Sequence, residues 1–495
     1  MIASAASPTS PDPLTARCQR SSSRFRLPGL LLTVLVLGLP VGSDAQFAEP
    51  ERTWTLDYVL RPAFEGQSME VTAVLRGDIS GGVVWHMAQG LEAQVDRSRP
   101  EARDGFGQPL RVASVEEGWV ITGGSGEGMR ISYTLSSPEA RPRGTGGIGF
   151  GSEVLYGPAG AIFLIPAPAQ DPDPSGERLR IGPIEVVFDI PVSWHIVVPW
   201  EGYGRRYRPQ GPGELWEAIV AVGDLRRRVV EIAGIEVTIG IQGRRPSMDT
   251  AVMEGVRRVL RTGQEVYGAP ASSRMTVVLP EVRAGGARVT RLGRSLAMDW
   301  EDRPGVSTET DLLHQMTREL LFMWRGVEPP EPAWYAEGMT DYLAWLVLLR
   351  QNLVDGEEFS QRLLAAERSY LDHPHHTDWS LVQEEARLDR AGLTMPSSLA
   401  RSRGVVVSLA LDATLARLSG GRSRLTDLLG TVHRSRMEEG GKPAAIQNAD
   451  IMRACSVLTG GDYLDEFFTT LVFGTGRPPT AEALADILGR EGVRR

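Results

Sequence analysis

Lysine and cysteine are nearly missing from this chain of 495 residues. Lys442 is the only lysine, so arginine carries almost all of the positive charge, a usage that a GC-rich genome explains. The two cysteines are Cys18 and Cys455. Loss of the N-terminus together with Cys18 leaves no partner for an internal disulfide, even in an oxidising compartment. Cys455 lies in a helical pattern over residues 451–458, and we expect a buried, unreactive thiol there.

An excess of basic charge and two common nucleophile patterns are also absent. The net charge is −9, and an acidic chain is a poor candidate for binding nucleic acid, because that binding depends on neutralising phosphates. The sequence has no Gly-x-Ser-x-Gly motif and no histidine near Cys455, so nothing indicates a serine or cysteine hydrolase. Hydrophobic residues at 42% and charged residues at 23% are ordinary for a globular protein of roughly two to four domains.

The one long hydrophobic run lies near the N-terminus, at residues 27–42. It follows an arginine-bearing segment, and Ser43 and Ala45 supply small residues at positions −3 and −1 of a cleavage before Gln46. The run is too short for a comfortable transmembrane helix. We therefore predict that residues 1–45 are a cleaved export signal and that the protein is periplasmic or extracellular. An uncleaved membrane anchor is the alternative.

Residues 46–230 are predicted to form an all-β domain. Apolar and polar residues alternate over 53–60 and 69–75, the pattern of half-buried strands. Further short strands are predicted at 119–122, 129–135, 161–165, 184–190 and 195–199. Strands of this length and spacing are typical of a β-sandwich. The segments 141–151 and 166–176 have loop composition, and the glycines of the first lack the strand–loop–helix frame of a phosphate-binding loop.

The rest of the chain shows a mixed pattern followed by a helical one. Residues 231–400 are predicted to alternate strands and helices, and residues 401–495 to be mostly helical. The predicted strands are 235–242, 275–280 and 295–300, and the first helix is 248–267. Two amphipathic helices joined by a short Pro-rich turn are predicted over 312–349. Further helices are predicted at 359–370, 404–418, 423–429 and 462–473.

Residues 334–359, WYAEGMTDYLAWLVLLRQNLVDGEEF, resemble the glycyl aminopeptidase family of metallopeptidases, relatives of thermolysin and of the leukotriene hydrolase type. Further matches follow in order, at YLDHP (370–374), 404–421 and 462–474. The resemblance covers most of the chain after the signal and implies a multidomain α+β fold. An N-terminal all-β, sandwich-like domain then precedes a thermolysin-like α+β domain at 231–400 and a mostly helical C-terminal part. Members often carry a PDZ domain, which the sequence lacks.

In that family, the first of the two central helices carries a His-Glu-x-x-His motif. The two histidines and a downstream glutamate hold zinc, and the motif glutamate is the general base on a zinc-bound water. In this sequence the histidine positions hold Arg318 and Phe322, the base position keeps Glu319, and the third-ligand position keeps Glu337. Arginine cannot be deprotonated to become a ligand, and one carboxylate cannot make a tetrahedral zinc site. The resemblance implies zinc for the family, but the residues predict no metal and no cofactor here.

We predict that the guanidinium of Arg318 replaces the charge of the metal. It would pair with Glu337, and with Glu319 as well, because a buried carboxylate without a cation is costly. The family also places a tyrosine ahead of a Lys/Arg-Gly pair. The pair is present here as Arg403-Gly404, but the three residues before it are Ala-Arg-Ser.

Three other arrangements compete with this one. His314 lies one helical turn before Arg318, and a site of His314 with Glu337 is still one ligand short. The histidine-rich segment 373–376 is expected in a solvated loop. A metal-free carboxylate pair of Glu319 and Glu337, of the glycosidase type, conflicts with the nearby arginine, because such a pair needs one protonated acid and a cation favours the charged form of both.

The leading hypothesis is therefore an exported, zinc-free pseudopeptidase that binds a peptide or a partner protein in the former substrate cleft. One alternative is an active zinc aminopeptidase with atypical ligands. The other is a structural envelope protein that uses only the β-domain.

Overall fold

A computed structural model describes most of the chain after residue 51. The described residues are 52–63, 67–79, 81–88, 96–116, 118–123, 127–136, 149–150, 153–168, 179–243, 246–268, 272–281, 289–298, 309–325, 331–390, 398–438 and 445–492. The predicted export signal and most of the glycine-rich loop at 141–151 lie outside these residues. Among the helices that are described, none is long and apolar enough to cross a membrane.

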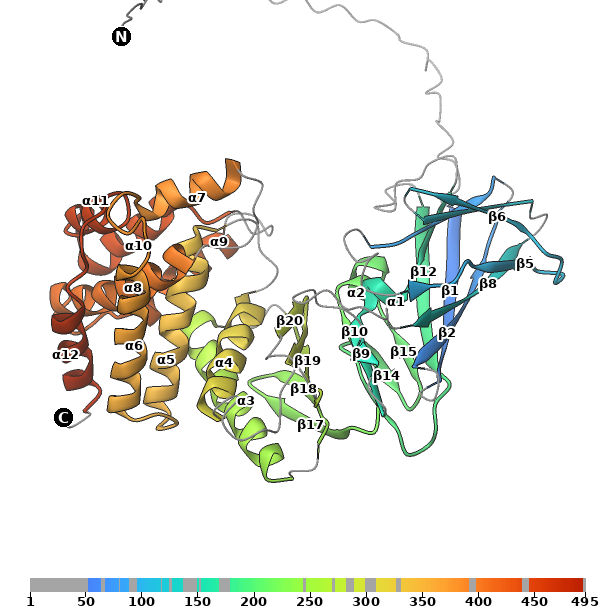
Figure 1. Cartoon of the computed structure of the whole chain (residues 1–495), viewed down its shortest axis with the longest axis horizontal. Coiled ribbons are helices and arrows are strands. Elements are labelled where there is room, and N and C mark those ends of the chain that lie inside the picture. The colour runs from blue at the N-terminus through green and yellow to red at the C-terminus, as the bar shows by residue number, and fades with distance from the viewer. Residues whose placement is uncertain are drawn as a thin grey trace, which may run out of the picture. The chain divides into compact units, whose positions relative to one another are not determined.

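The N-terminal part is built on a sheet with the strand order β14-β15-β12-β1-β2-β8-β4, with β5 paired to β8. Its long strands, seen side by side in Figure 1, are β1 (Arg52–Ala63), β2 (Ser68–Arg76), β8 (Gly128–Ser136) and β12 (Leu179–Phe188). Its short strands are β4 (Asp96–Arg97), β5 (Glu101–Asp104), β14 (Glu201–Tyr203) and β15 (Arg206–Arg208). The buried residues of β2 alternate along the strand, at Met69, Val71, Ala73 and Leu75. This confirms the period-two prediction.

Two smaller sheets complete the β-rich part, with the orders β13-β16-β10-β9 and β11-β3-β7-β6. Their strands are β3 (Val83–His86), β6 (Arg111–Val115), β7 (Gly118–Thr122), β9 (Gly149–Phe150), β10 (Val154–Pro158), β11 (Ile165–Pro168), β13 (His195–Val197) and β16 (Ile219–Gly223). Two short helices accompany them, α1 (Ala159–Ile162) and α2 (Pro212–Trp216).

The strand predicted at 161–165 is wrong, because its first residues belong to α1 and only Ile165 begins a strand. Every residue of α1 is buried, so the apolar run shows no periodicity that could separate a helix from a strand. The loop predicted at 166–176 is also partly wrong. Its first three residues belong to β11, which pairs with β3.

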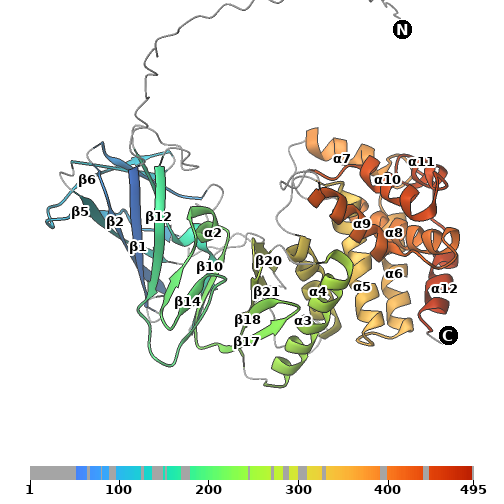
Figure 2. The ribbon, with the colours of Figure 1, turned by 180° about the vertical axis from the view of Figure 1, so that it is seen from behind.

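The middle part holds a sheet with the order β17-β18-β19-β21-β20. The strands are β17 (Arg226–Ile232), β18 (Ile235–Ile241), β19 (Arg274–Leu279), β20 (Val289–Leu292) and β21 (Ser295–Met298). The helix α3 (Pro246–Tyr267) connects the parallel strands β18 and β19. Figure 2 shows α3 and α4 (Glu309–Arg325) beside these strands. The domain boundary predicted at 230 falls inside β17, whose pairing with β18 places it in the middle part.

The C-terminal part is helical. The pair predicted over 312–349 consists of α4 and a second helix that begins as a π-helical turn, η2 (Trp334–Met339), and continues as α5 (Thr340–Arg350). The remaining helices are α6 (Gly356–Leu371), α7 (Leu381–Arg390), α8 (Ser398–Leu418), α9 (Leu425–Glu438), α10 (Asn448–Thr459), α11 (Asp465–Leu471) and α12 (Thr480–Arg490). The boundary predicted at 400 falls inside α8, and the helix predicted at 462–473 is limited to α11.

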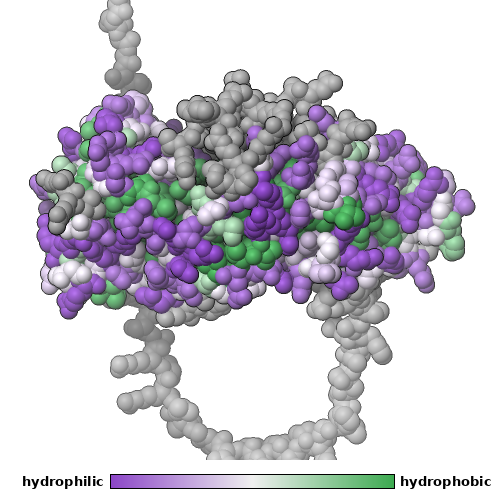
Figure 3. Space-filling view, turned by 90° about the horizontal axis from the view of Figure 1, so that it is seen from below, coloured by the Kyte–Doolittle hydropathy of each residue, from purple (hydrophilic) through white to green (hydrophobic). Residues whose placement is uncertain are grey.

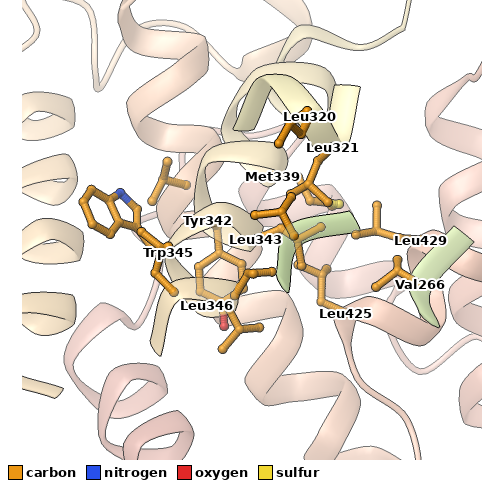
Figure 4. Packing of buried hydrophobic residues seen from close by; sticks show 14 of the residues in the cluster. Val266, Leu320, Leu321, Met339, Tyr342, Leu343, Trp345, Leu346, Leu425 and Leu429 are labelled. Atoms are coloured by element: carbon orange, nitrogen blue, oxygen red, sulfur yellow. The ribbon is translucent and has the colours of Figure 1, made fainter. Parts of the chain in front are cut away.

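The prediction that the second central helix is amphipathic is wrong. Every residue of α5 from Thr340 to Leu349 is buried, because α4, α6 and α8 all pack against it. A helix surrounded in this way has no polar face. Figure 4 shows part of its surroundings, with residues of α5, α4 and α9 in one apolar cluster. Cys455 is buried in the same cluster, as predicted, and burial raises the pKa of its thiol to about 12.

The Arg403-Gly404 pair has a packing role in α8. The guanidinium of Arg403 is buried and donates to the carbonyl oxygens of Trp379, Leu471, Gly474 and Gly476. Gly404 faces η2, and a Cβ at this position would lie 3.0 Å from the Cα of Gly338 and 2.8 Å from the carbonyl oxygen of Trp334. Glycine is therefore what lets α8 lie directly against the turn that carries Glu337.

Replacement of Gly404 by alanine is expected to lower the free energy of unfolding by about 1–3 kcal/mol, the usual cost of overpacking a rigid contact. Urea unfolding of the full chain measures it. Gly489→Ala in α12 is the matched control, because a Cβ there meets nothing within 4 Å. This control is expected to stabilise the helix by about 0.5–1 kcal/mol. Equal effects of the two substitutions would contradict the packing role of Gly404.

The surface is predominantly polar where it is seen in Figure 3, with apolar residues in separate patches between hydrophilic ones. The large apolar side chains that are exposed come from different elements, and the most exposed are Phe106, Val192 and Tyr203.

Candidate functional site

The predicted site residues come from two consecutive elements, α4 and η2. Arg318 and Phe322 are four residues apart on α4, so both side chains point to the same side of the helix. Glu319 follows Arg318 and is buried. Glu337 lies within η2, where the wider π-helical turn places it opposite α4. The structure brings all four residues together.

Arg318 is at the centre of the site. Its Nη2 donates to Oε2 of Glu337, which is the predicted contact, and its Nη1 donates to Oε1 of Glu319. Its Nε lies 3.0 Å from Oδ1 of Asp341, close enough for an ion pair although the N–H is not aligned as a hydrogen bond. One guanidinium therefore serves three carboxylates.

Both carboxylate oxygens of Glu319 accept hydrogen bonds from arginines. Arg318 donates to Oε1, and Nη1 of Arg291 donates to Oε2 at 2.9 Å. Arg291 comes from β20, the strand that ends the middle sheet. Glu319 is thus held between two cations.

Phe322 presents its aromatic ring to two arginines of the site. The guanidinium carbon of Arg291 lies 4.1 Å from the ring centroid, and that of Arg318 lies 5.1 Å from it. A cation over an aromatic face is attracted by the negative charge of that face. Phe322 thus stabilises the two arginines and offers no atom that binds a metal.

Asp341 is a site residue that the sequence argument missed. Arg401 of α8 holds it side-on, with Nε donating to Oδ2 and Nη2 donating to Oδ1 at 3.1 Å. Burial lowers the pKa of Arg401, but the hydrogen bond and the charge of Asp341 outweigh burial and raise it overall. Asp341 follows Glu337 by four residues, and that spacing was a signal that could have identified it. No spacing in the sequence links Arg291 or Arg401 to the site in this way.

The connected charges form a linear series, which we call the ion chain. It runs Arg291–Glu319–Arg318–Asp341–Arg401, and Glu337 is attached to its central member. Three guanidiniums balance three carboxylates. Removal of one partner from a buried series of this kind leaves an uncompensated charge, which is strongly destabilising.

His314 lies beside the ion chain, near Asp341 and not beside Glu337 as the sequence alternative had it. Its Nε2 lies 3.8 Å from Oδ1 of Asp341, and its ring is stacked on Trp345 with centroids 3.9 Å apart. Burial lowers the pKa of His314 to about 4, although the charge of Asp341 acts in the opposite direction.

This lowered pKa predicts a pH-dependent stability. Between pH 6.5 and about 4 the unfolded chain binds a proton at His314 that the folded chain does not bind, so the stability is fully present above pH 6.5 and falls as the pH is lowered. The loss amounts to about 3 kcal/mol by pH 4. The variant His314→Phe keeps a ring against Trp345. We expect its free energy of unfolding, measured in urea, to fall less between pH 7 and pH 4 than that of the unchanged protein. His195→Phe, at an exposed histidine, is expected to show the same pH dependence of the unfolding free energy as the unchanged protein. An unchanged pH dependence in His314→Phe would contradict the prediction.

The histidine-rich segment 373–376 lies in turns after α6, as predicted, but its rings are partly buried. Nδ1 of His376 lies 2.8 Å from the carbonyl oxygen of His373, and His375 stacks on Trp379 with centroids 3.7 Å apart. These rings serve the local packing of the turn.

The residues at the site do not fit a zinc centre. Within the part of the chain that the structure describes, no three His, Cys, Asp or Glu side chains are grouped so that they could hold a metal ion. The space between Glu337 and Glu319 holds a guanidinium that donates to both. The site is a balanced set of ion pairs, with three guanidiniums and three carboxylates.

No protein-family model and no curated protein matches this sequence, but solved structures do. An aminopeptidase N family protein from Idiomarina loihiensis is similar with a TM-score of 0.69 and 14% identity, over 87% of this chain and 78% of that chain. The M1 zinc metallopeptidase from Deinococcus radiodurans is similar with a TM-score of 0.50 and 15% identity, over 87% of this chain and 95% of that chain.

These similarities establish the fold. The β-rich N-terminal domain, the α+β middle region and the helical C-terminal part together form the multidomain architecture of the M1 metallopeptidases. The predicted fold class is confirmed.

Proposed function

We propose that this protein is an exported pseudopeptidase, a degenerate relative of the M1 and glycyl aminopeptidase type that binds a peptide or a partner protein without zinc and without hydrolysing it. The observation that carries this proposal is the position of Arg318. Its guanidinium lies among Glu337, Glu319 and Asp341, where the family holds a metal.

Chemistry supports the absence of hydrolysis. Peptide hydrolysis by this fold depends on a cation that polarises the carbonyl and lowers the pKa of a bound water, and on a base that takes the proton. Arg318 is engaged with three carboxylates, and a guanidinium has no coordination position at which it could bind a water as a metal ion does. The glutamate at the base position is engaged as well, because each oxygen of Glu319 already accepts a hydrogen bond from a guanidinium.

Metal analysis of the purified full chain tests the zinc-free state. We expect zinc far below one equivalent after exposure to zinc and removal of the excess, and no release of amino acids from aminoacyl reporter substrates. Stoichiometric zinc that is lost in Glu337→Ala would overturn the proposal in favour of an active enzyme with atypical ligands.

Peptide binding and export have separate tests. Affinity selection from a random hexapeptide pool is expected to retain peptides, whereas a protein with a purely structural envelope role retains none. N-terminal sequencing of the protein recovered from its native compartment is expected to begin at Gln46. If the protein is recovered from a membrane fraction and its first residue lies upstream of residue 27, the N-terminal segment is an uncleaved membrane anchor and not a cleaved signal.

A further inference from the structure

The ion chain is electrically balanced, but its charges are not equally accessible. The carboxylates are shielded, with side chains that are 9% exposed for Glu319, 8% for Asp341 and 20% for Glu337. The two arginines at its ends are the accessible members, with side chains that are 36% exposed for Arg291 and 48% for Arg401. A molecule that approaches either end of the series therefore meets a guanidinium before it meets a carboxylate.

Arg401 has the geometry of a prepared anion site. Asp341 occupies its Nε–Nη2 edge, and within the described part of the chain no acceptor is paired with Nη1. The second edge of the guanidinium, between Nη1 and Nη2, has the fork shape that matches a carboxylate with two parallel hydrogen bonds.

The orientation of this edge is set by the rest of the ion chain. Asp341 is buried and is also held by Arg318, so the carboxylate that fixes Arg401 cannot rotate freely. A donor that is fixed before binding loses little conformational entropy when its ligand arrives. Arg401 thus combines exposure with preorganisation.

We propose that this site binds a carboxylate group of a peptide, either the C-terminal carboxylate or an Asp or Glu side chain, and that the Nη1–Nη2 edge of Arg401 is its recognition element. The inference rests on the proposed pseudopeptidase function and names the ligand class for it. This selectivity for a carboxylate is the opposite of that of an aminopeptidase, which holds its substrates through a free amino terminus.

Affinity selection with four forms of one random hexapeptide pool tests the proposal. The pool is synthesised as the C-terminal acid or amide, and each of these with a free or an acetylated N-terminus. Preferential retention of the acid forms identifies the C-terminal carboxylate as the ligand, and enrichment of Asp and Glu in the amide forms identifies an acidic side chain. Acetylation is expected to make no difference.

Variants of Arg401 link the binding to the residue. Arg401→Gln is expected to weaken the binding of a selected peptide about 10- to 100-fold, the usual effect of losing a charge-assisted hydrogen-bonded pair. Arg401→Lys keeps the charge without the fork and is expected to lose less. Arg453→Gln on α10 is the matched control, because this arginine also pairs with an aspartate, Asp450, and it should bind as the unchanged protein does. Circular dichroism establishes that each variant is folded.

Several results would overturn the inference. In the selection, these are peptides retained only when their N-terminus is free, peptides retained equally with and without a carboxylate, or no peptides retained from any pool. In the variants, it is equal binding by Arg401→Gln and Arg453→Gln. Zinc measured in the same preparations separates the two proposals. Zinc-free protein that selects free amino termini contradicts only the ligand class, whereas stoichiometric zinc contradicts the pseudopeptidase itself.

Discussion

Replacement of Arg318 by alanine is expected to destabilise the protein by about 3–5 kcal/mol, the usual cost of removing one partner from a buried ion pair. Arg318 serves three carboxylates. Two of them retain another arginine in the variant, because Arg291 still pairs with Glu319 and Arg401 still pairs with Asp341. Among the described residues Glu337 pairs with Arg318, so the cost falls mainly on this carboxylate.

Urea unfolding is the appropriate measurement, since urea is uncharged and leaves ion pairs unscreened. Two further arms identify the cause. Guanidinium at low millimolar concentration, far below denaturing levels, is expected to restore part of the stability of Arg318→Ala and to leave the unchanged protein unaffected. The double variant Arg318→Met with Glu337→Gln removes both charges and is expected to recover most of the loss. A loss below about 1 kcal/mol in Arg318→Ala, the value of an exposed ion pair, would show that the site is solvated.

The second large effect is a gain of metal binding. Arg318→His combined with Phe322→His rebuilds a His-Glu-x-x-His sequence on α4, with both imidazoles one helical turn apart and Glu337 opposite them. We expect about one equivalent of zinc in this double variant, against almost none in the unchanged protein. The substitution also removes the guanidinium that occupies the position and the ring that faces it.

Three matched variants make this result specific. Each single histidine substitution is expected to bind zinc much more weakly, because a structural zinc site needs its full set of protein ligands. The triple variant that adds Glu337→Gln is expected to lose the zinc, since a neutral amide replaces the ligand carboxylate. A double variant that folds but binds no zinc would mean that η2 and α4 no longer have the geometry of the metallopeptidase fold at this point.

Periodicity and motif spacing located much of the architecture and the centre of the site. The alternation along β1 and β2 identified the long strands, and the pairing of Arg318 with Glu337 follows from the family spacing and from the cost of a bare buried carboxylate. Periodicity failed where burial is complete. The residues of α1 and α5 are apolar on all sides, so their patterns do not distinguish a helix from a strand or show which face is inside.

The sequence by itself determined that positions 318 and 322 offer no metal ligand, because arginine cannot be deprotonated and phenylalanine has no donor atom. Only the tertiary structure decided which charges meet around Arg318. Arg291 is 28 residues from its partner Glu319, and Arg401 is 60 residues from Asp341. Side chains at such separations meet only when the middle sheet and α8 have packed around α4 and α5. The ion chain and its exposed arginine ends are therefore properties of the folded chain.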